Sequence, residues 1–267
     1  MTTRNLDALF EPHAIALIGA SNRDGSVGSV LARNLLESGF AGPVLPVNPH
    51  EGAIRSAMAY AKVADLPVTP DLAVIATPPQ SIPGLIAELG ARGCRAAVVI
   101  STGFGADAGP DGARLKAEML QAAKPHLLRI IGPNCLGFIS PARGINASFA
   151  HLTPAAGRIA LVAQSGAVAA AAIDWAHAQG IGFSHIVTIG DAADVDFGDL
   201  LDYLALDAAT QAILLYVESI HDARKFMTAA RIASRNKPVV VVKTGRSAAG
   251  AKAAFSHTGA LAGSDAV

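Results

Sequence analysis

The stretch from Ala14 to Gly39, AIALIGASNRDGSVGSVLARNLLESG, combines the three features that decide the fold. Ala14 to Ile18 is a short apolar run, typical of a strand that is buried on both faces of a parallel sheet. A loop from Gly19 to Gly28 follows, and a helix is predicted from about Val27 to Ser38, where Gly39 ends it. A strand that leads through a glycine-rich turn into a helix directs backbone N–H groups and a helix N-terminus at a phosphate.

The same alternation of strands and helices continues through the first half of the chain. Further apolar runs end in loops rich in Asn, Pro, Ser, Thr and Gly, and helices of ordinary length lie between them. This spacing predicts a doubly wound parallel sheet, in which ligands bind at the carboxyl ends of the strands. The predicted strands are Val44–Val47, Leu72–Ala76, Ala96–Ile100 and Arg129–Ile131, and the helices are Leu6–Phe10, Ile82–Gly90 and Gly112–Lys124.

The first loop and the end of the second strand indicate which nucleotide is bound. A NAD site normally has the motif Gly-x-Gly-x-x-Gly in the first turn and an acid at the end of strand two. Here the loop begins Gly19-x-Ser21, and strand two ends in Asn48, so a nicotinamide dinucleotide is disfavoured. A phosphorylated adenosine with a long arm stays compatible, with Ser21, Arg23 and the loop amides on its phosphates. Glycine-rich first turns also occur for packing reasons, and this alternative stays open.

The second half of the chain repeats the pattern after a predicted connector at Gly144 to Pro154. It predicts a second open α/β domain, which we assign to residues 154–267, whereas the first domain takes residues 1–140. Its predicted strands are Arg158–Ala163, His185–Ile189, Ala212–Val217 and Pro238–Val242, and its helices are Ala167–Gln179, Phe197–Leu206 and Ala223–Ser234.

Three features of this second half lie after predicted strands and therefore at one edge of the sheet. They are the Gln164-Ser165-Gly166 turn, Glu218, and His257 in a loop of small residues. Together they supply an imidazole nucleophile, a carboxylate to hold its other nitrogen, and a helix N-terminus to receive an anion, which are the parts of a phosphohistidine site. The alternatives are an idle histidine in a mobile tail and an acid that caps a helix or forms a salt bridge at the rim.

The composition limits the partners and the compartment. The chain has 21 Lys and Arg residues and 21 Asp and Glu residues, so no net electrostatic field attracts nucleic acid or an anionic membrane. The two cysteines, Cys94 and Cys135, offer neither a disulfide framework nor a metal cluster, and we assign no metal ligands. Neither a membrane-spanning segment nor a signal peptide is recognisable, so we expect a cytoplasmic protein.

Four motifs of the chain resemble the nucleoside-diphosphate-forming acyl-CoA synthetases, relatives of the succinyl-CoA synthetase α subunit. They are Ile131-Gly132-Pro133-Asn134-Cys135-x-Gly137, Gln164-Ser165-Gly166, Asp194-Val195-Asp196-Phe197-x-Asp199-Leu200-Leu201, and Ser256-His257-Thr258-Gly259-Ala260. The resemblance runs from about Leu9 to the last residue. It implies an α/β fold of two doubly wound domains, a Rossmann-like CoA-binding domain and then a flavodoxin-like, succinyl-CoA-synthetase-type domain, which we expect to be C-terminally truncated here.

The resemblance also implies roles for individual residues. His257 would carry the phosphoryl group, Glu218 would orient it, and Ser165 and Gly166 would contact the phosphate. Asp191 stands at a position where the family often has Asn, and this difference would change how tightly the phosphate or carboxylate is bound. The implied CoA contacts are Gly19, Ser21, Arg23, Gly28, Asn48, Pro49, Thr77, Pro78, Ser101, Gly103 and Phe104, with Asn134 nearby.

The reaction implied by the resemblance joins a small carboxylate to CoA with ATP or GTP and yields acyl-CoA, nucleoside diphosphate and phosphate. Nothing in the chain resembles the ATP-grasp module that would hold the nucleotide and Mg²⁺, so we expect an ATP-grasp domain or β subunit as partner and an inactive chain by itself. The intact enzyme would be a homo-oligomer or a heterotetramer. The alternative function is an acyl-CoA-sensing regulatory region of a protein lysine acetyltransferase, and the pairing of His257 with Glu218 favours catalysis.

Overall fold

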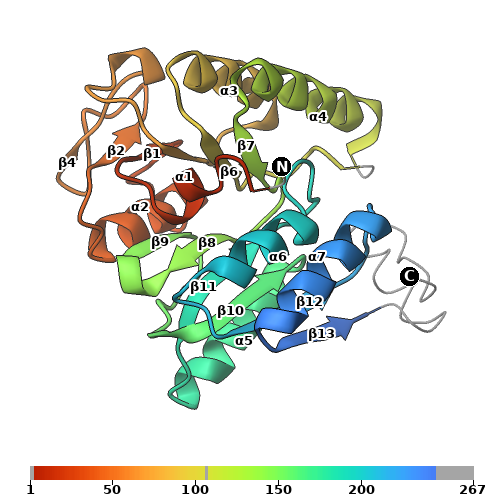
Figure 1. Cartoon of the computed structure of the whole chain (residues 1–267). Helices are drawn as coiled ribbons and strands as arrows, with labels where there is room; N and C mark the ends of the chain where they lie inside the picture. The colour runs from red at the N-terminus through yellow and green to blue at the C-terminus, as the bar shows by residue number, and fades with distance from the viewer. Residues whose placement is uncertain (1–2, 106–107, 245–267) are drawn as a thin grey trace.

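The computed structural model describes residues 3–105 and 108–244 and contains two open α/β units side by side (Figure 1). In the first unit all strand pairs are parallel, and the strand order is β2-β1-β5-β6-β7. The chain therefore moves outward in both directions from β1, which makes the sheet doubly wound, as predicted. The strands are β1 (Ile15–Ile18), β2 (Val44–Val47), β5 (Leu72–Ile75), β6 (Ala96–Val99) and β7 (Arg129–Ile131).

Alternate residues of β1 pack against opposite faces, which explains why every residue of this strand is apolar and buried. Leu17 joins one core cluster with Leu31 of the α2 helix, whereas Ile18 joins another with Ile86 of α3 and Met119 of α4. Helices on both faces of a parallel sheet leave no solvated side, so an alternating polar pattern is not needed. The helices of this unit are α1 (Asp7–Phe10), α2 (Val27–Glu37), α3 (Ile82–Ala91) and α4 (Gly109–Ala123).

The second unit has the strand order β13-β12-β10-β11-β8-β9, with a parallel part and an antiparallel hairpin at one edge. Helices α6 and α7 cover one face and α5 covers the other (Figure 1). The fold class predicted for this half, a doubly wound α/β domain, is thereby confirmed. Its elements are β8 (Gly137–Ser140), β9 (Ile145–Ser148), β10 (Ala156–Ala163), α5 (Gly166–Ala178), β11 (Phe183–Thr188), α6 (Phe197–Leu206), β12 (Ala212–Val217), α7 (Ala223–Asn236) and β13 (Val239–Lys243).

The prediction of a connector at residues 144–154 was wrong, because residues 145–148 form β9. Residues 137–140, which the predicted boundary leaves in the first domain, form β8 and pair with β11 of the second sheet. These short strands were not predicted because polar residues interrupt the apolar pattern that is typical of a buried strand. Asn146 and Ser148 are fully buried, yet both have partners: the Ser148 hydroxyl donates to the Asn146 side-chain oxygen at 2.6 Å, and the Asn146 amide donates to the Thr153 hydroxyl at 2.9 Å.

Several short elements were also absent from the sequence prediction. A two-strand hairpin follows β2, and single 3-10 turns connect longer elements, where local turn chemistry rather than an apolar pattern sets the backbone. They are β3 (Ala53–Ile54), β4 (Ala57–Met58), η1 (Val63–Asp65), η2 (Pro79–Ser81), η4 (Lys124–His126) and η5 (Pro141–Arg143).

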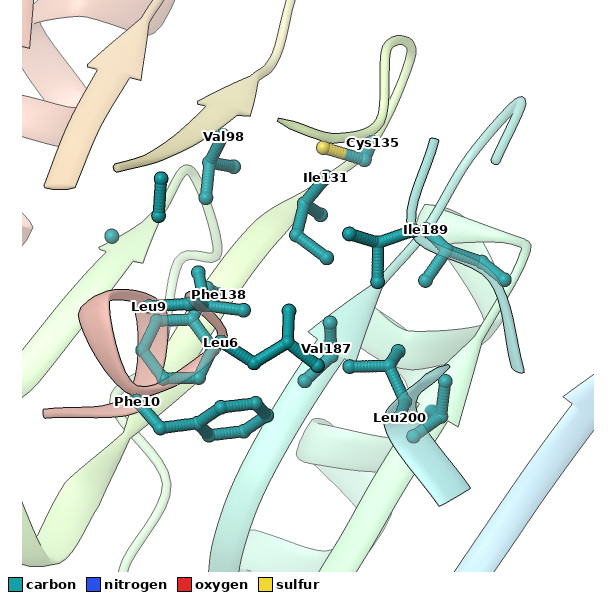
Figure 2. Close-up of a cluster of buried hydrophobic side chains, with 14 of the residues drawn as sticks. Leu6, Leu9, Phe10, Val98, Ile131, Cys135, Phe138, Val187, Ile189 and Leu200 are labelled. Carbon is teal, nitrogen blue, oxygen red and sulfur yellow. The ribbon is translucent and has the colours of Figure 1, made fainter. Parts of the chain in front are cut away.

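An apolar cluster crosses the junction between the two sheets (Figure 2). Phe10 of the N-terminal helix α1 is 1% exposed, its ring lies edge-on to Phe138 with centroids 5.4 Å apart, and it stacks on Tyr203 at 4.1 Å. Val98 of the first sheet and Val187 of the second belong to the same cluster. The two units therefore share one continuous core, which fixes how their sheets face each other.

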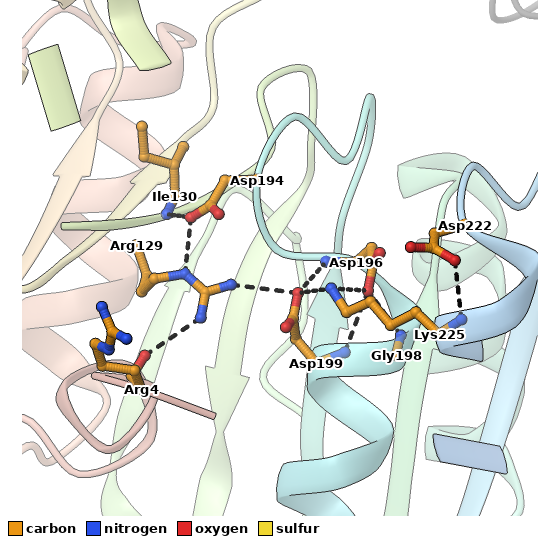
Figure 3. A network of polar contacts seen from close by, with 9 residues as sticks. All are labelled: Arg4, Arg129, Ile130, Asp194, Asp196, Gly198, Asp199, Asp222 and Lys225. Atoms are coloured by element: carbon orange, nitrogen blue, oxygen red, sulfur yellow. Dashed lines mark hydrogen bonds and ion pairs between the residues drawn. The ribbon is translucent and has the colours of Figure 1, made fainter. Parts of the chain in front are cut away.

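A network of charges forms a second link across this junction (Figure 3). Arg129 of β7 reaches Asp194 at 2.9 Å and Asp199 at 3.2 Å, and Lys225 of α7 lies 2.6 Å from Asp199 and 2.9 Å from Asp196. Asp196 is the N-cap of α6 and forms a capping box with Asp199. Negative charge is stabilised at the N-terminus of a helix, so both acids are favourable here. Burial raises the pKa of Asp199 above its ordinary value although Lys225 and Arg129 oppose the shift.

Candidate functional site

A cavity of about 570 Å³ lies between the two units, where strands of both sheets end. The first unit contributes the segments after β6 and β7 and one side chain of α4. The second contributes the end of β9 and the segments after β10, β11 and β12. The cavity brings together four residues assigned to the site from the sequence, namely Asn134, Ser165, Gly166 and Glu218. Its lining also includes residues that were not assigned, among them Thr102, Lys116, Phe149, Ser219 and His221.

Gln164 connects the turn after β10 to the segment that carries Glu218. Its side-chain oxygen accepts hydrogen bonds from the backbone N–H groups of Glu218 at 2.6 Å and Ser219 at 2.8 Å. Its side-chain amide donates to the Ser219 hydroxyl at 3.2 Å. Because Gln164 and Glu218 are each only 8% exposed, this triple contact fixes the position of Glu218 on the cavity wall.

The first turn of α5 opens onto the same cavity. Ser165 is its N-cap, and the hydroxyl accepts from the N–H of Val168 at 3.3 Å. A Cβ on Gly166 would lie 3.2 Å from the Leu136 side chain, so a small residue here lets α5 approach the segment after β7. Gly166 and Ala167, the first residues of this 13-residue helix, line the cavity, and a helix N-terminus favours an anion.

Asn134 lies across from this helix and contacts the second unit. Its backbone has a φ of +59°, and its side-chain amide donates to a carboxylate oxygen of Asp191 at 3.2 Å. The Asp191 N–H donates to the carbonyl of Pro133 at 3.0 Å. A Cβ on Gly190 would lie 2.2 Å from the carbonyl oxygens of Pro133 and Asn134, so only glycine permits this close approach. Asp191 thus orients the Asn134 amide.

The first loop of the chain is shaped by its own packing. Gly19 has a φ of +89°, and a Cβ on Gly28 would lie 2.0 Å from the Gly19 carbonyl oxygen. The packing role left open from the sequence therefore applies to both glycines. The Asn48 amide donates to the Ala20 carbonyl at 2.7 Å, and the Ser21 hydroxyl accepts from the N–H of Arg23 at 3.0 Å. Asn48 holds this loop in place from the end of β2.

The remaining residues assigned to CoA form a row along the carboxyl edge of the first sheet. The Ser101 hydroxyl donates to the Thr77 carbonyl at 2.6 Å, and the Asn134 N–H donates to the Ser101 carbonyl at 3.0 Å. Pro49 and Pro78 are exposed beside them. Phe104 as a whole is 1% exposed and packs in the core of the first unit, so it offers a ligand almost no surface here. Of this whole set, Asn134 alone lines the cavity between the units.

Cys135 borders the cavity but is not a nucleophile. Burial raises the pKa of its thiol to about 12, and the sulfur donates to the Val99 carbonyl at 3.3 Å. The thiol therefore stays protonated at neutral pH, and a protonated thiol is a poor nucleophile.

His257 lies outside the described residues, so its predicted pairing with Glu218 stays a prediction. The described chain ends beside that acid. The Thr244 N–H donates to the Val217 carbonyl at 3.0 Å, and the Lys243 ammonium donates to the Glu218 carbonyl at 3.1 Å. The end of β13 is therefore adjacent to the segment that carries Glu218.

Some of the unassigned cavity residues lie close in sequence to assigned ones and could have been predicted from that, whereas others could not. Thr102 lies within the loop already assigned to CoA, and His221 follows Glu218 by three residues. Lys116 lies in the middle of a helix, and Phe149 follows the unpredicted strand β9, so neither has a local motif. Within residues 3–105 and 108–244, no group of three or more His, Cys, Asp and Glu side chains could hold a metal ion, and no helix there could span a membrane.

Two family models cover nearly all of this chain. The CoA binding domain matches residues 13–141, and the succinyl-CoA ligase like flavodoxin domain matches residues 156–267. The ADP-forming acetate–CoA ligase I of Archaeoglobus fulgidus is 44% identical over 259 residues, which are 97% of this chain and 37% of that protein. The α subunit of the ADP-forming acetate–CoA ligase I of Pyrococcus furiosus is 40% identical over 267 residues, 98% of this chain and 58% of that subunit.

A solved structure agrees with these relatives. The dinucleotide-forming acetyl-coenzyme A synthetase 1 of Candidatus Korarchaeum cryptofilum, in complex with phosphate and ADP, has a TM-score of 0.91 at 38% identity, over 98% of this chain and 56% of that chain. This chain thus spans between 37% and 58% of the length of these three relatives. It belongs to the nucleoside-diphosphate-forming acyl-CoA synthetase family and corresponds to its α-type region, a CoA-binding domain followed by a succinyl-CoA ligase-like flavodoxin domain.

Proposed function

We propose that this chain is the CoA-binding and phosphoryl-accepting part of an acyl-CoA synthetase that converts a small carboxylate, CoA and ATP or GTP into acyl-CoA, nucleoside diphosphate and phosphate. The observation that carries the proposal is the cavity between the two units. It combines a helix N-terminus for an anion, at Ser165 and Gly166, with the buried acid Glu218 and the amide of Asn134.

The path of CoA follows from the first sheet. Its phosphates would bind at the loop from Gly19 to Gly28, near Asn48, because the chain reverses direction around β1 and such switch points open a crevice. The arm would then cross the ends of β5 and β6 to reach β7. Three inter-strand spacings of about 4.8 Å give roughly 14 Å, and this distance brings the thiol end to Asn134 and the cavity.

The chemistry would proceed in two transfers. A phosphoryl group on an imidazole nitrogen of His257 passes to a carboxylate oxygen, so that a P–N bond breaks and an acyl phosphate forms. The CoA thiolate then attacks the acyl carbonyl, and phosphate leaves as the C–S bond forms. The N-terminus of α5 would stabilise charge on the phosphate in both steps, and Glu218 would hold the imidazole tautomer.

Phosphorylation of His257 requires a nucleotide site, which we place on a partner. An ATP-grasp domain or β subunit would bind the nucleotide with Mg²⁺, and the assembled enzyme would be a homo-oligomer or a heterotetramer. The supporting observation is that this chain spans 58% of a relative named as an α subunit. CoA and nucleoside triphosphates as substrates fit the predicted cytoplasmic location.

The test uses radiolabelled nucleotide and the complementing ATP-grasp partner. The wild type should acquire acid-labile, base-stable label, His257→Ala should acquire none, and Glu218→Gln should acquire much less while binding CoA as before. Glu118→Gln, an exposed acid on α4, is the matched control and should label normally. Label that persists in His257→Ala would refute the phosphohistidine, and a wild type that binds CoA but never labels would favour the acyl-CoA-sensing alternative.

A further inference from the structure

One side of the cavity is apolar and includes an exposed aromatic ring. Its residues are Leu136, Phe149, Ala167 and Ala170. Phe149 is 38% exposed, although Ile145 and Ala147 of the preceding strand are 1% and 0% exposed. Pockets for small molecules combine such apolar surface with a few placed polar groups. We name these four residues the apolar wall.

The apolar wall is held by contacts between three separate segments. The N–H of Phe149 donates to the Leu136 carbonyl at 3.2 Å, and Leu136 packs against Gly166 at the start of α5. Ala167 and Ala170 are three positions apart on α5 and therefore lie on the same face of the helix. Because both are alanines, they leave room in front of Phe149 that a larger side chain would fill.

The apolar wall continues into the polar part of the same cavity, where Ser165, Glu218 and Asn134 lie. On the basis of the proposed function, we infer that the apolar wall binds the substituent of the acyl group and that Ala170 and Phe149 determine which acyl groups fit. The reacting carboxyl carbon would then lie at the polar end, between Asn134 and the start of α5.

Charge limits the class of acid. None of the four residues of the apolar wall is charged, and the Lys116 and His221 side chains that line the cavity come from α4 and from the segment after β12. Asp191 also lines the cavity and would repel a second carboxylate. An ionised group against the apolar wall would lose hydration without a partner. The substrates are therefore monocarboxylic acids with an apolar side chain, and dicarboxylic acids are excluded.

The measurement is calorimetric titration of residues 1–267 with CoA, acetyl-CoA, butyryl-CoA and succinyl-CoA. A methylene that leaves water strengthens binding by about fourfold, so the two extra methylenes of butyryl-CoA should improve the dissociation constant about 15-fold over acetyl-CoA. Succinyl-CoA, of the same chain length, should bind no better than acetyl-CoA.

Two variants and a matched control locate the effect. Ala170→Phe should reduce the gain from acetyl-CoA to butyryl-CoA to less than about threefold, since the ring occupies the space, and leave CoA affinity unchanged. Phe149→Ala should also reduce the gain, because it removes the surface that the chain would cover. Ala171→Phe places the same ring one residue along α5 on exposed surface and should keep the gain of about 15-fold.

The outcomes separate this inference from the proposed function. If CoA binds but Ala170→Phe and Phe149→Ala keep the gain of the wild type, or if succinyl-CoA matches butyryl-CoA, the apolar wall is not the acyl site and the proposed function stands. If CoA itself does not bind, the proposed function fails and this inference fails with it.

Discussion

Replacement of Gln164 by Leu should destabilise the chain through two backbone groups rather than through lost packing. The Gln164 oxygen accepts from the N–H groups of Glu218 and Ser219 at 2.6 and 2.8 Å, and all three residues are less than 10% exposed. Leucine has a similar volume but no acceptor, so both donors lose their partner. An unsatisfied buried donor costs about 1–3 kcal/mol, which gives about 2–6 kcal/mol for the pair. Because the cavity adjoins both groups and admits water, we expect about 2–3 kcal/mol.

Urea denaturation at 25 °C measures this loss as a change in the free energy of unfolding. Gln179→Leu, at the exposed end of α5, is the control and should stay within about 0.5 kcal/mol of the wild type. Amide hydrogen exchange gives a local measurement: the Glu218 and Ser219 amides should exchange about 30-fold faster in Gln164→Leu if local opening costs about 2 kcal/mol less. Unchanged stability together with unchanged exchange of these amides would refute the role assigned to Gln164.

Three further predictions concern the junction, a buried histidine and the first loop. Phe10→Ala should lower the free energy of unfolding by about 3–5 kcal/mol, because its ring is buried between the two units, whereas Leu206→Ala, which is 80% exposed, should change little in the same denaturation assay. Burial lowers the pKa of His185 below its ordinary value of 6.5, so the unfolded chain takes up a proton near pH 6.5 while the folded chain stays neutral. The stability present above pH 6.5 should therefore be lost as the pH falls toward the folded pKa. Urea denaturation between pH 5 and pH 8 should show that the free energy of unfolding depends less on pH in His185→Phe than in the wild type, and an equal pH dependence would contradict this assignment. Arg23→Ala should weaken CoA binding by about 1–3 kcal/mol in calorimetry if the guanidinium contacts a CoA phosphate, and unchanged affinity would leave Arg23 as a solvated loop residue.

The sequence by itself determined the parallel strands and the edge at which the site lies. Runs such as Ala14–Ile18 and Ala212–Val217 are recognisable because a strand buried on both faces needs apolar residues at every position, which is a local requirement. The ends of the predicted strands differ from the observed ones by at most two residues, and three strands, Val44–Val47, Arg129–Ile131 and Ala212–Val217, coincide. Since parallel strands end at one edge, the order of strands along the chain already placed Asn134, Ser165 and Glu218 on ligand-binding edges.

Only the tertiary structure decided which side chains meet across that edge. Gln164 reaches Glu218 over 54 positions, Arg129 reaches Asp194 over 65, and Asn134 reaches Asp191 over 57. Such contacts depend on how two sheets are packed, and no local pattern encodes that packing. The β8–β9 hairpin escaped prediction for the same reason, because Asn146 and Ser148 are polar and are buried only through partners that the fold supplies. The apolar wall exists because Phe149, Leu136 and α5 come from three such distant segments, and packing between the two units brings them together.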